Sequence, residues 1–315
     1  MFGMKKEIDF YGHRKIYYTI SVCLIVIAAV CALVFGVKVD IQFTGGTIAT
    51  YSYEGDLDFQ AVEKAASEAT GLKVTSDSSA SVSSGLKQIA LNFSTKDGLA
   101  VEKEDALTSS LEEKFADNNL KYVSIDSVAA NMGTDFLIKC LVAVFAAFVL
   151  MIVYIAIRFS RIGGWSAGLT GVIALLHDTL MVLAVFIIFR LPIDDNFMAV
   201  ILFILGYSIN DTIVIFDRIR ENEKLYGKSM QIVPLVNKSI NQTLRRTMNT
   251  TVSTLIAMGC VCIFAVVFQV NSIVSFAFPM VIGLFSGFYS SVCLTGTIWA
   301  WWKSKDHTHH KKAKA

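Results

Sequence analysis

The chain has 315 residues, of which 54% are hydrophobic and 17% charged, and its 28 basic and 26 acidic side chains leave a net charge of +2. Such an apolar composition excludes a disordered or collagen-like chain, and the near balance of charge argues against a nucleic-acid-binding domain. All six cysteines lie within apolar runs, which predicts reduced, buried thiols rather than a disulfide framework or a zinc site.

Six runs of mostly apolar residues are long enough to cross a bilayer, which takes about 20 residues as a helix. The first run ends without a small-residue cleavage site, so we predict a retained anchor rather than a signal peptide. The predicted spans are residues 16–37, 136–157, 164–189, 197–216, 250–270 and 275–302.

Lysine and arginine gather on one side of these spans, which predicts the orientation of the chain. Residues 40–135, on the other side, hold 16 acidic and 7 basic side chains and therefore a net charge of −9. We expect a multi-pass protein of the cell membrane with both termini in the cytoplasm. Its parts would be a cytoplasmic N-terminus at 1–15, a first span at 16–37, an external domain at 38–135, a five-helix region at 136–302 and a cytoplasmic basic tail at 303–315.

The external segment alternates strand and helix patterns, with period-2 runs for strands and apolar residues at helical spacing for helices. The expected elements are a strand at 41–53, a helix at 58–70, a strand at 72–75, a flexible Ser-rich loop at 76–85, a strand at 89–93, a helix at 102–116 and a strand at 122–128. The order β-α-β-β-α-β predicts an α+β, ferredoxin-like domain. It contains no nucleophile–base pair, metal cluster or phosphate loop, which favours a binding or mechanical module over an enzyme.

The fourth span contains Asp211, within the sequence GYSINDT at 206–212. Placing an ionisable side chain at the centre of a membrane helix costs roughly 2.5–3.5 kcal/mol of insertion free energy, so such a residue usually has a structural or functional role. One interpretation is a carboxylate that takes up and releases a proton, or that binds a cation together with the oxygens of Asn210, Ser208 and Thr212. The other is a structural hydrogen bond or a fixed ion pair.

Two further polar features lie near the membrane core. His177 and Asp178 occupy the middle of the third span, where they form either a proton relay or a satisfied packing pair. Arg246 precedes the fifth span, where it is either a cytoplasmic flank or an ion-pair partner of Asp211.

The sequence GWSAG at 164–168 matches the G-x-S-x-G elbow of serine hydrolases. A nucleophilic serine needs a base within hydrogen-bond reach, and His177 is about 16 Å further along the same helix by rise. We therefore exclude a serine hydrolase. Gly164 and Gly168 instead predict a helix-packing face, as do Gly283 and Gly287 in the sixth span.

The sequence DIQFTGGT at 40–47 follows the first predicted span. It is similar to the signature DFTGGT of the SecD/SecF family, stretched by inserted residues around 41–42. The matching positions are Asp40, Phe43, Thr44, Gly45, Gly46 and Thr47. The pair His177-Asp178, the segment 206–222 and the sequence TLRRT at 243–247 resemble the SecF-type pattern as well, and so does the layout of spans.

The resemblance implies a subunit of a membrane complex in the RND superfamily. Such a subunit pairs with SecD, assists the SecYEG channel and the SecA ATPase, and uses the proton motive force to draw unfolded polypeptides outward. The family's essential intramembrane Asp and Arg fall on Asp211 and Arg246, with H⁺ as the coupling ion, Na⁺ as its alternative, and no cofactor. Two other functions stay open: a scaffold that stabilises the translocon, and half of a small-molecule exporter.

Overall fold

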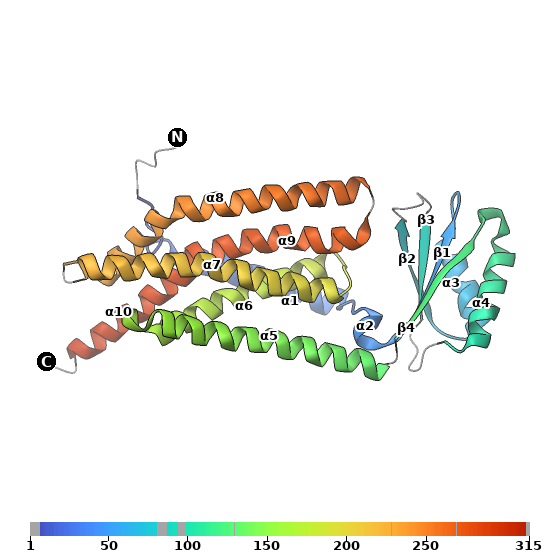
Figure 1. Ribbon diagram of the computed structural model, residues 1–315, viewed down its shortest axis with the longest axis horizontal. Coiled ribbons are helices and arrows are strands. Elements are labelled where there is room, and N and C mark those ends of the chain that lie inside the picture. The colour runs from blue at the N-terminus through green and yellow to red at the C-terminus, as the bar shows by residue number, and fades with distance from the viewer. Residues whose placement is uncertain are drawn as a thin grey trace.

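The computed structural model describes residues 7–80, 87–93, 99–128, 130–227, 229–268 and 270–312. A bundle of long helices forms one end of the molecule, and a small domain of strands and helices forms the other (Figure 1). Among the described residues, six helical segments are long and apolar enough to cross a membrane, which confirms the predicted number of spans. These segments are Arg14–Phe35, Gly133–Arg158, Gly164–Ile188, Asp195–Tyr226, Ile232–Val267 and Ile273–Lys305.

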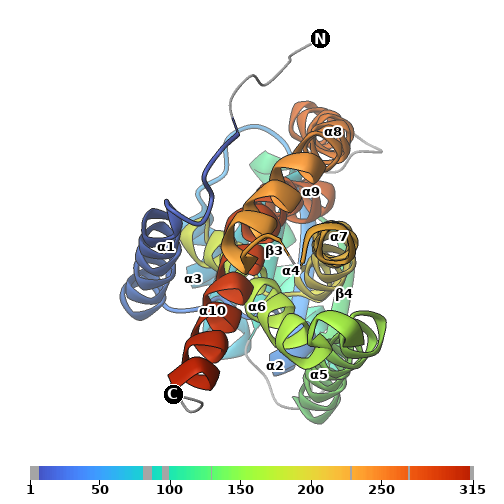
Figure 2. The same ribbon diagram turned by 90° about the vertical axis from the view of Figure 1, so that its left-hand side faces the viewer.

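The bundle is built around its third and fourth spans. Its helices are α1 (Arg14–Phe35), α5 (Ala130–Arg158), α6 (Gly164–Ile188), α7 (Asp195–Tyr226), α8 (Ile232–Val267), α9 (Asn271–Tyr289) and α10 (Gly296–Lys312). A π-helical turn, Ser290–Thr295, joins the last two. Helix α6 lies between α1, α5 and α7 (Figure 2). Over half of the apolar stretch of α6 and of α7 is buried, against 6% in α1 and 11% in α8.

Three helices differ from the predicted spans. Helix α7 continues ten residues past the predicted end at 216, and α8 begins at Ile232 rather than near 250. Among the polar residues of these extensions, only Arg, Lys, Glu and Gln are good helix formers, so packing between the two extensions also keeps the helices going past the apolar run. The two extensions are connected by hydrogen bonds. Asn222 Nδ2 on α7 donates to Ser239 Oγ and Gln242 Oε1 on α8, both at 2.8 Å. The sixth predicted span is in fact α9, the π turn and α10.

The small domain follows α1 and contains one antiparallel sheet. Its elements are α2 (Ile41–Thr44), β1 (Gly46–Tyr53), α3 (Phe59–Thr70), β2 (Val74–Ala80), β3 (Lys87–Phe93), α4 (Val101–Lys114) and β4 (Lys121–Val128). The strands lie in the order β2-β3-β1-β4, so the first strand pairs with the third and the fourth. Tyr51, Ile89, Leu91 and Leu107 are fully buried in its core, between the sheet and the helices α3 and α4.

Two local predictions for this domain were wrong. Residues 41–44 form the helix α2 rather than the start of a strand, because Thr44 Oγ1 donates to Asp40 O and positive φ angles at Gly45 (76°) and Gly46 (148°) turn the chain before β1 begins. Residues 76–80 belong to β2 rather than to a loop, since pairing with β3 overrides the weak strand propensity of serine. The rest of the predicted loop, 81–85, lies outside the described residues.

The cysteines are also placed differently from the prediction. All six are free, but none is fully buried as predicted. Cys23 and Cys260 are exposed on the outer surfaces of α1 and α8, and the other four are half-buried. An apolar thiol suits such a surface when the helix faces lipid, because lipid and protein interior are similarly apolar.

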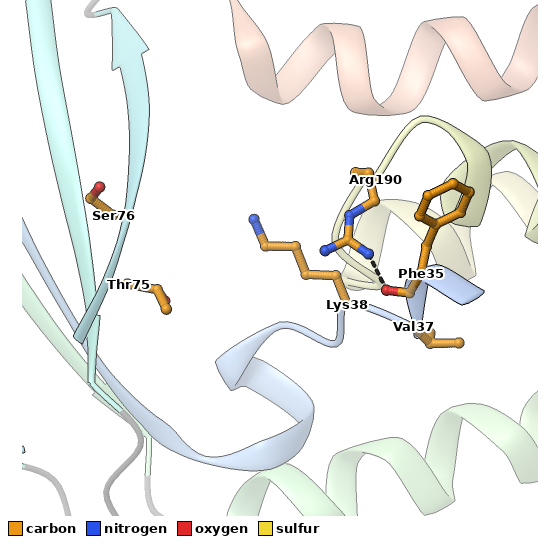
Figure 3. Close-up of a pocket in the computed structure, with 6 residues that line it drawn as sticks. All are labelled: Phe35, Val37, Lys38, Thr75, Ser76 and Arg190. Carbon is orange, nitrogen blue, oxygen red and sulfur yellow. Dashed lines mark hydrogen bonds between the residues drawn. The ribbon is translucent and has the colours of Figure 1, made fainter. Parts of the chain in front are cut away.

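The small domain is joined to the bundle by backbone contacts. Ile193 N donates to Lys38 O at 2.8 Å, and Asp40 N donates to Ile193 O at 3.0 Å, in a parallel bridge just before α7 begins. Arg190, in the same turn, donates to Phe35 O at the end of α1 (Figure 3). We call the region where residues 38–45 meet the bundle the joint. Here the rings of Phe43 and of Phe136 on α5 also stack, with centroids 5.5 Å apart.

Four glycines stand at close helix contacts. A Cβ on Gly164 would overlap Ala156 O, and one on Gly168 would lie 3.1 Å from Ile152 O, both on α5. A Cβ on Gly283 would meet Ile204 at 2.9 Å, and one on Gly287 would meet Ser208 at 3.2 Å, both on α7.

The contact of Gly164 leads to a stability prediction. We expect Gly164→Ala to destabilise the chain by about 2–3 kcal/mol, because the added methyl meets a backbone oxygen that cannot rotate away. Gly206→Ala is the control, since a Cβ there meets nothing within 4 Å. Thermal unfolding of the purified chain in detergent measures both, and equal midpoints for the two variants would contradict the close approach.

Candidate functional site

Asp211 lies in the bundle on α7 and is 2% exposed. Its Oδ2 atom is buried without a hydrogen-bond partner. The Thr251 hydroxyl on α8 lies beside the carboxylate, and Tyr207 OH, one turn earlier on α7, donates to Thr251 Oγ1 at 3.4 Å. A carboxylate with an unused oxygen in a buried place is costly to keep ionised, which makes Asp211 the least satisfied acid of the described bundle.

Arg246 is the cation whose charge acts on Asp211. It lies on α8, whose early start at Ile232 places the arginine within the helix rather than before it. Among the described residues, no ion pair within 4 Å joins it to Asp211, and its side chain is exposed. The next residue, Thr247, is buried with an unpartnered hydroxyl. Asn210, the predicted neighbour of Asp211, is exposed and does not share its interior position.

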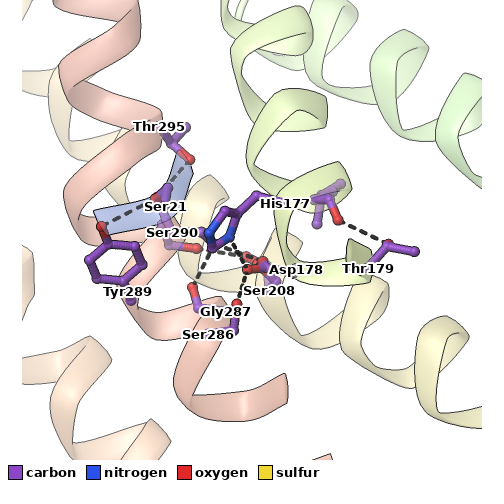
Figure 4. A network of polar contacts seen from close by, with 12 residues as sticks. Ser21, His177, Asp178, Thr179, Ser208, Ser286, Gly287, Tyr289, Ser290 and Thr295 are labelled. Atoms are coloured by element: carbon purple, nitrogen blue, oxygen red, sulfur yellow. Dashed lines mark hydrogen bonds and ion pairs between the residues drawn. The ribbon is translucent and has the colours of Figure 1, made fainter. Parts of the chain in front are cut away.

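Asp178 on α6 is fully buried and has several partners (Figure 4). Its Oδ2 accepts from Ser208 Oγ on α7 and Ser290 Oγ in the π turn, and its Oδ1 accepts from Ser286 Oγ on α9, each at 2.7 Å. The carboxylate therefore ties three helices together at one point. We call these four residues the Asp178 cluster. Sequence analysis assigned Ser208 to Asp211, but the structure places its hydroxyl on Asp178. It missed Ser286 and Ser290, although the two stand four apart in an apolar run, a spacing that places them on one helix face.

His177 lies next to Asp178 and points toward α1 (Figure 4). Its Nδ1 is 3.3 Å from Asp178 Oδ1, while its Nε2 is buried without a partner. Its ring lies 5.9 Å from that of Tyr289, whose hydroxyl donates to Tyr17 O at 2.7 Å and is 3.2 Å from Ser21 Oγ. His177 thus has one nitrogen in contact with the Asp178 cluster and one that is buried without a hydrogen-bond partner.

Helix α7 lies between the two acidic positions. Its Asp211 side faces Thr251 on α8, whereas Ser208 and Thr212 face α6 and the π turn. Thr212 Oγ1 is 3.1 Å from Ser291 Oγ, which in turn donates to Ser208 O at 3.2 Å. Any movement of α7 therefore changes the surroundings of both Asp211 and Asp178.

The serine of the G-x-S-x-G sequence has a structural role. Ser166 Oγ donates to Gly163 O at 2.7 Å and accepts from Trp299 Nε1 at 3.1 Å. Its hydroxyl helps to fix α10 against α6. Among the described residues, no three His, Cys, Asp or Glu side chains gather as a metal site.

The signature residues lie at the joint between the two parts of the molecule. Asp40 takes part in the parallel bridge, and Phe43 packs on α5. The backbone of Gly45 comes so near α5 that a Cβ on Gly133 would lie 2.9 Å from Gly45 N. Thr47, at the start of β1, is 2.8 Å from Ser127 Oγ on β4. The signature thus attaches the small domain to the bundle.

Comparison with known proteins identifies the family of this chain. Residues 108–305 match the family model "Protein export membrane protein SecD/SecF, C-terminal". The chain is 32% identical to the protein translocase subunit SecF of Sebaldella termitidis, over 90% of this chain and 88% of that protein. It is 30% identical to the protein translocase subunit SecDF of Bacillus subtilis, over 95% of this chain and 38% of that longer protein.

A solved structure has the same fold. The crystal structure of SecDF, a translocon-associated membrane protein from Thermus, superposes with a TM-score of 0.81 at 26% identity. The match covers 96% of this chain and 40% of that one, so this chain spans about two fifths of its length. With six apolar helices, a family model over most of its length and relatives above 30% identity, the chain is a membrane protein that belongs to the SecD/SecF family of protein export.

Proposed function

We propose that this chain is the SecF-type half of a protein-export complex in the cell membrane, where it couples proton entry to the outward movement of polypeptides. Its partner would be a SecD-type chain, with the SecYEG channel, SecA and the unfolded polypeptide as further contacts. The observation that carries this proposal is Asp211, a buried carboxylate with an unpartnered oxygen beside the charge of Arg246. The chain would hold no cofactor and would not itself be an enzyme.

The coupling would begin at Asp211. A proton that reaches its free oxygen removes the negative charge, and the attraction between α7 and Arg246 on α8 is lost. The two helices can then slide against each other. One elementary charge crossing 100 mV supplies about 2.3 kcal/mol, enough to shift a two-state helix packing by tens of fold. Na⁺ at the same carboxylate is the alternative coupling ion.

The movement would reach the small domain through the start of α7. Asp211 is in the middle of α7, and Ile193, just before its first residue, is bonded to the linker at Lys38 and Asp40. A shift of α7 along its axis therefore pulls directly on the base of the small domain. We propose that this domain is ferredoxin-like, lies outside the cell, and acts as the moving part that handles polypeptide.

His177 and Asp178 would form a second proton-binding site in the same complex. The free Nε2 of His177 is the acceptor, and the Asp178 carboxylate holds the ring by its other nitrogen. Ser208 of α7 donates a hydrogen bond to Asp178, so a movement of α7 would affect both this site and Asp211.

Export in living cells tests the proposed function. We expect cells depleted of their own SecF-type subunit to recover export of a secretory protein when they produce this chain together with a SecD-type partner. The recovery should vanish when an ionophore collapses the proton motive force, whereas a scaffold would keep its effect. An inserted, partner-bound chain that leaves export unrestored would contradict the proposal.

A further inference from the structure

A cavity of about 440 Å³ lies at the joint, between the end of α1, the turn from α6 to α7, and strand β2 (Figure 3). It is lined by Phe35, Val37, Lys38, Thr75, Ser76 and Arg190. Helix α1 ends at Phe35, α6 ends at Ile188 and α7 begins at Asp195, so the cavity is level with the point where the bundle leaves the membrane. That level is the headgroup region of a bilayer.

Arg190 is the main charged group of this cavity. It is the one arginine of the eight in the chain that lies at this end of the bundle. Its φ angle is 58°, a conformation that is unfavourable for a side chain of this size and that is found more often at functional positions. One terminal nitrogen donates to Phe35 O, and the other lies on the side of Lys38 (Figure 3). The hydrogen bond to α1 therefore holds the guanidinium at the cavity.

A second cation faces the same space. The Lys38 ammonium extends between the helix ends and β2 (Figure 3), and its backbone is fixed by the bond from Ile193 N. Across the cavity, Thr75 contributes a hydroxyl, whereas the Ser76 hydroxyl already donates to Glu63 Oε1 at 2.7 Å. Glu63 lies on α3, behind the strand. The cavity thus combines a fixed guanidinium with an ammonium, which is the chemistry that binds phosphate.

We propose that this cavity binds the phosphate headgroup of an anionic phospholipid from the adjoining leaflet. The last turn of α1 continues the site into the membrane, because Leu33, Val34 and Phe35 are 88%, 68% and 55% exposed and offer an apolar surface to acyl chains. The bound headgroup would brace the joint between the bundle and the small domain.

Lipid retention by the purified full chain tests this site, without reference to protein export. We expect native mass spectrometry in detergent to show phosphatidylglycerol retained in preference to phosphatidylcholine. Lys38→Gln and Arg190→Asn should each reduce that retention about fivefold, the usual effect of one basic residue at an anionic surface. Asparagine is chosen at position 190 because it tolerates a positive φ angle. Lys139→Gln is the matched control, since Lys139 is exposed on α5 near the same end of the bundle but outside the cavity.

The results of these measurements distinguish a bound lipid headgroup from a free anion in the cavity. Loss of phosphatidylglycerol in both variants and not in Lys139→Gln supports the headgroup site. Equal retention in all four proteins overturns it. A rise in melting temperature with inorganic phosphate in lipid-free detergent, as large as that with phosphatidylglycerol, assigns the cavity to a free anion and overturns the lipid as its occupant.

Discussion

Asp211→Asn is expected to stop proton-driven export while the complex still assembles. The amide has nearly the shape of the carboxylate, but it can neither gain nor lose a proton at neutral pH. The coupled movement then loses the roughly 2.3 kcal/mol that one charge gains from 100 mV, which corresponds to about a 50-fold change in the driven equilibrium. Export of a secretory protein in cells with this variant as their only copy measures the effect.

Asp217→Asn is the matched control for this experiment. Asp217 lies on the same helix, six residues further on, and forms ion pairs with Arg158 at 3.2 Å and Arg220 at 2.5 Å at the exposed end of α7. We expect this substitution to leave export near the wild-type level, because exposed ion pairs contribute little. If Asp211→Asn exports normally at an equal membrane level, the coupling role of Asp211 is wrong and a scaffold becomes the better interpretation.

Asp178→Ala is expected to destabilise the bundle by about 2–4 kcal/mol. The substitution removes the acceptor of three serine hydroxyls that come from α7, α9 and the π turn, and it leaves them buried. Stepwise unfolding of the purified chain in detergent, followed by circular dichroism, measures the loss.

A double-mutant cycle shows whether the cluster acts as one unit. Ser286→Ala alone should cost about 1 kcal/mol, and it should cost almost nothing when Asp178 is already alanine, because its acceptor is gone. Full additivity of the two losses would mean that Ser286 and Asp178 do not depend on each other in the folded protein.

The membrane spans of this chain can be predicted from its sequence because the lipid bilayer restricts which segments can cross it. A helix must satisfy its own backbone in the bilayer and present apolar side chains, so runs of about 20 apolar residues reveal the spans. All six spans could be located in this way, and Asp211 and Asp178 stood out because acids are rare in such runs. The order of strands and helices in the small domain was equally visible, since it follows from local periodicity.

Element ends were less predictable, because the forces that set them are not local. The start of α8 at Ile232 depends on packing with the end of α7, and the strand at 76–80 depends on pairing with β3. Each partner is the neighbouring element, but the contacts between the two form only in the folded chain. The predicted span at 250–270 and the predicted loop at 76–85 followed local composition and therefore missed both.

The spans, the family resemblance and the acids in the membrane could be recognised without a structure, because they depend on composition and on short motifs. Which polar groups meet became known from the packing of the helices. It brought Ser208, Ser286 and Ser290 from distant segments to Asp178, left an oxygen of Asp211 unpartnered, and put Arg190 beside Lys38 at the joint. Such contacts depend on how helices cross in space, and the spacing of residues along one helix does not specify how that helix packs against another.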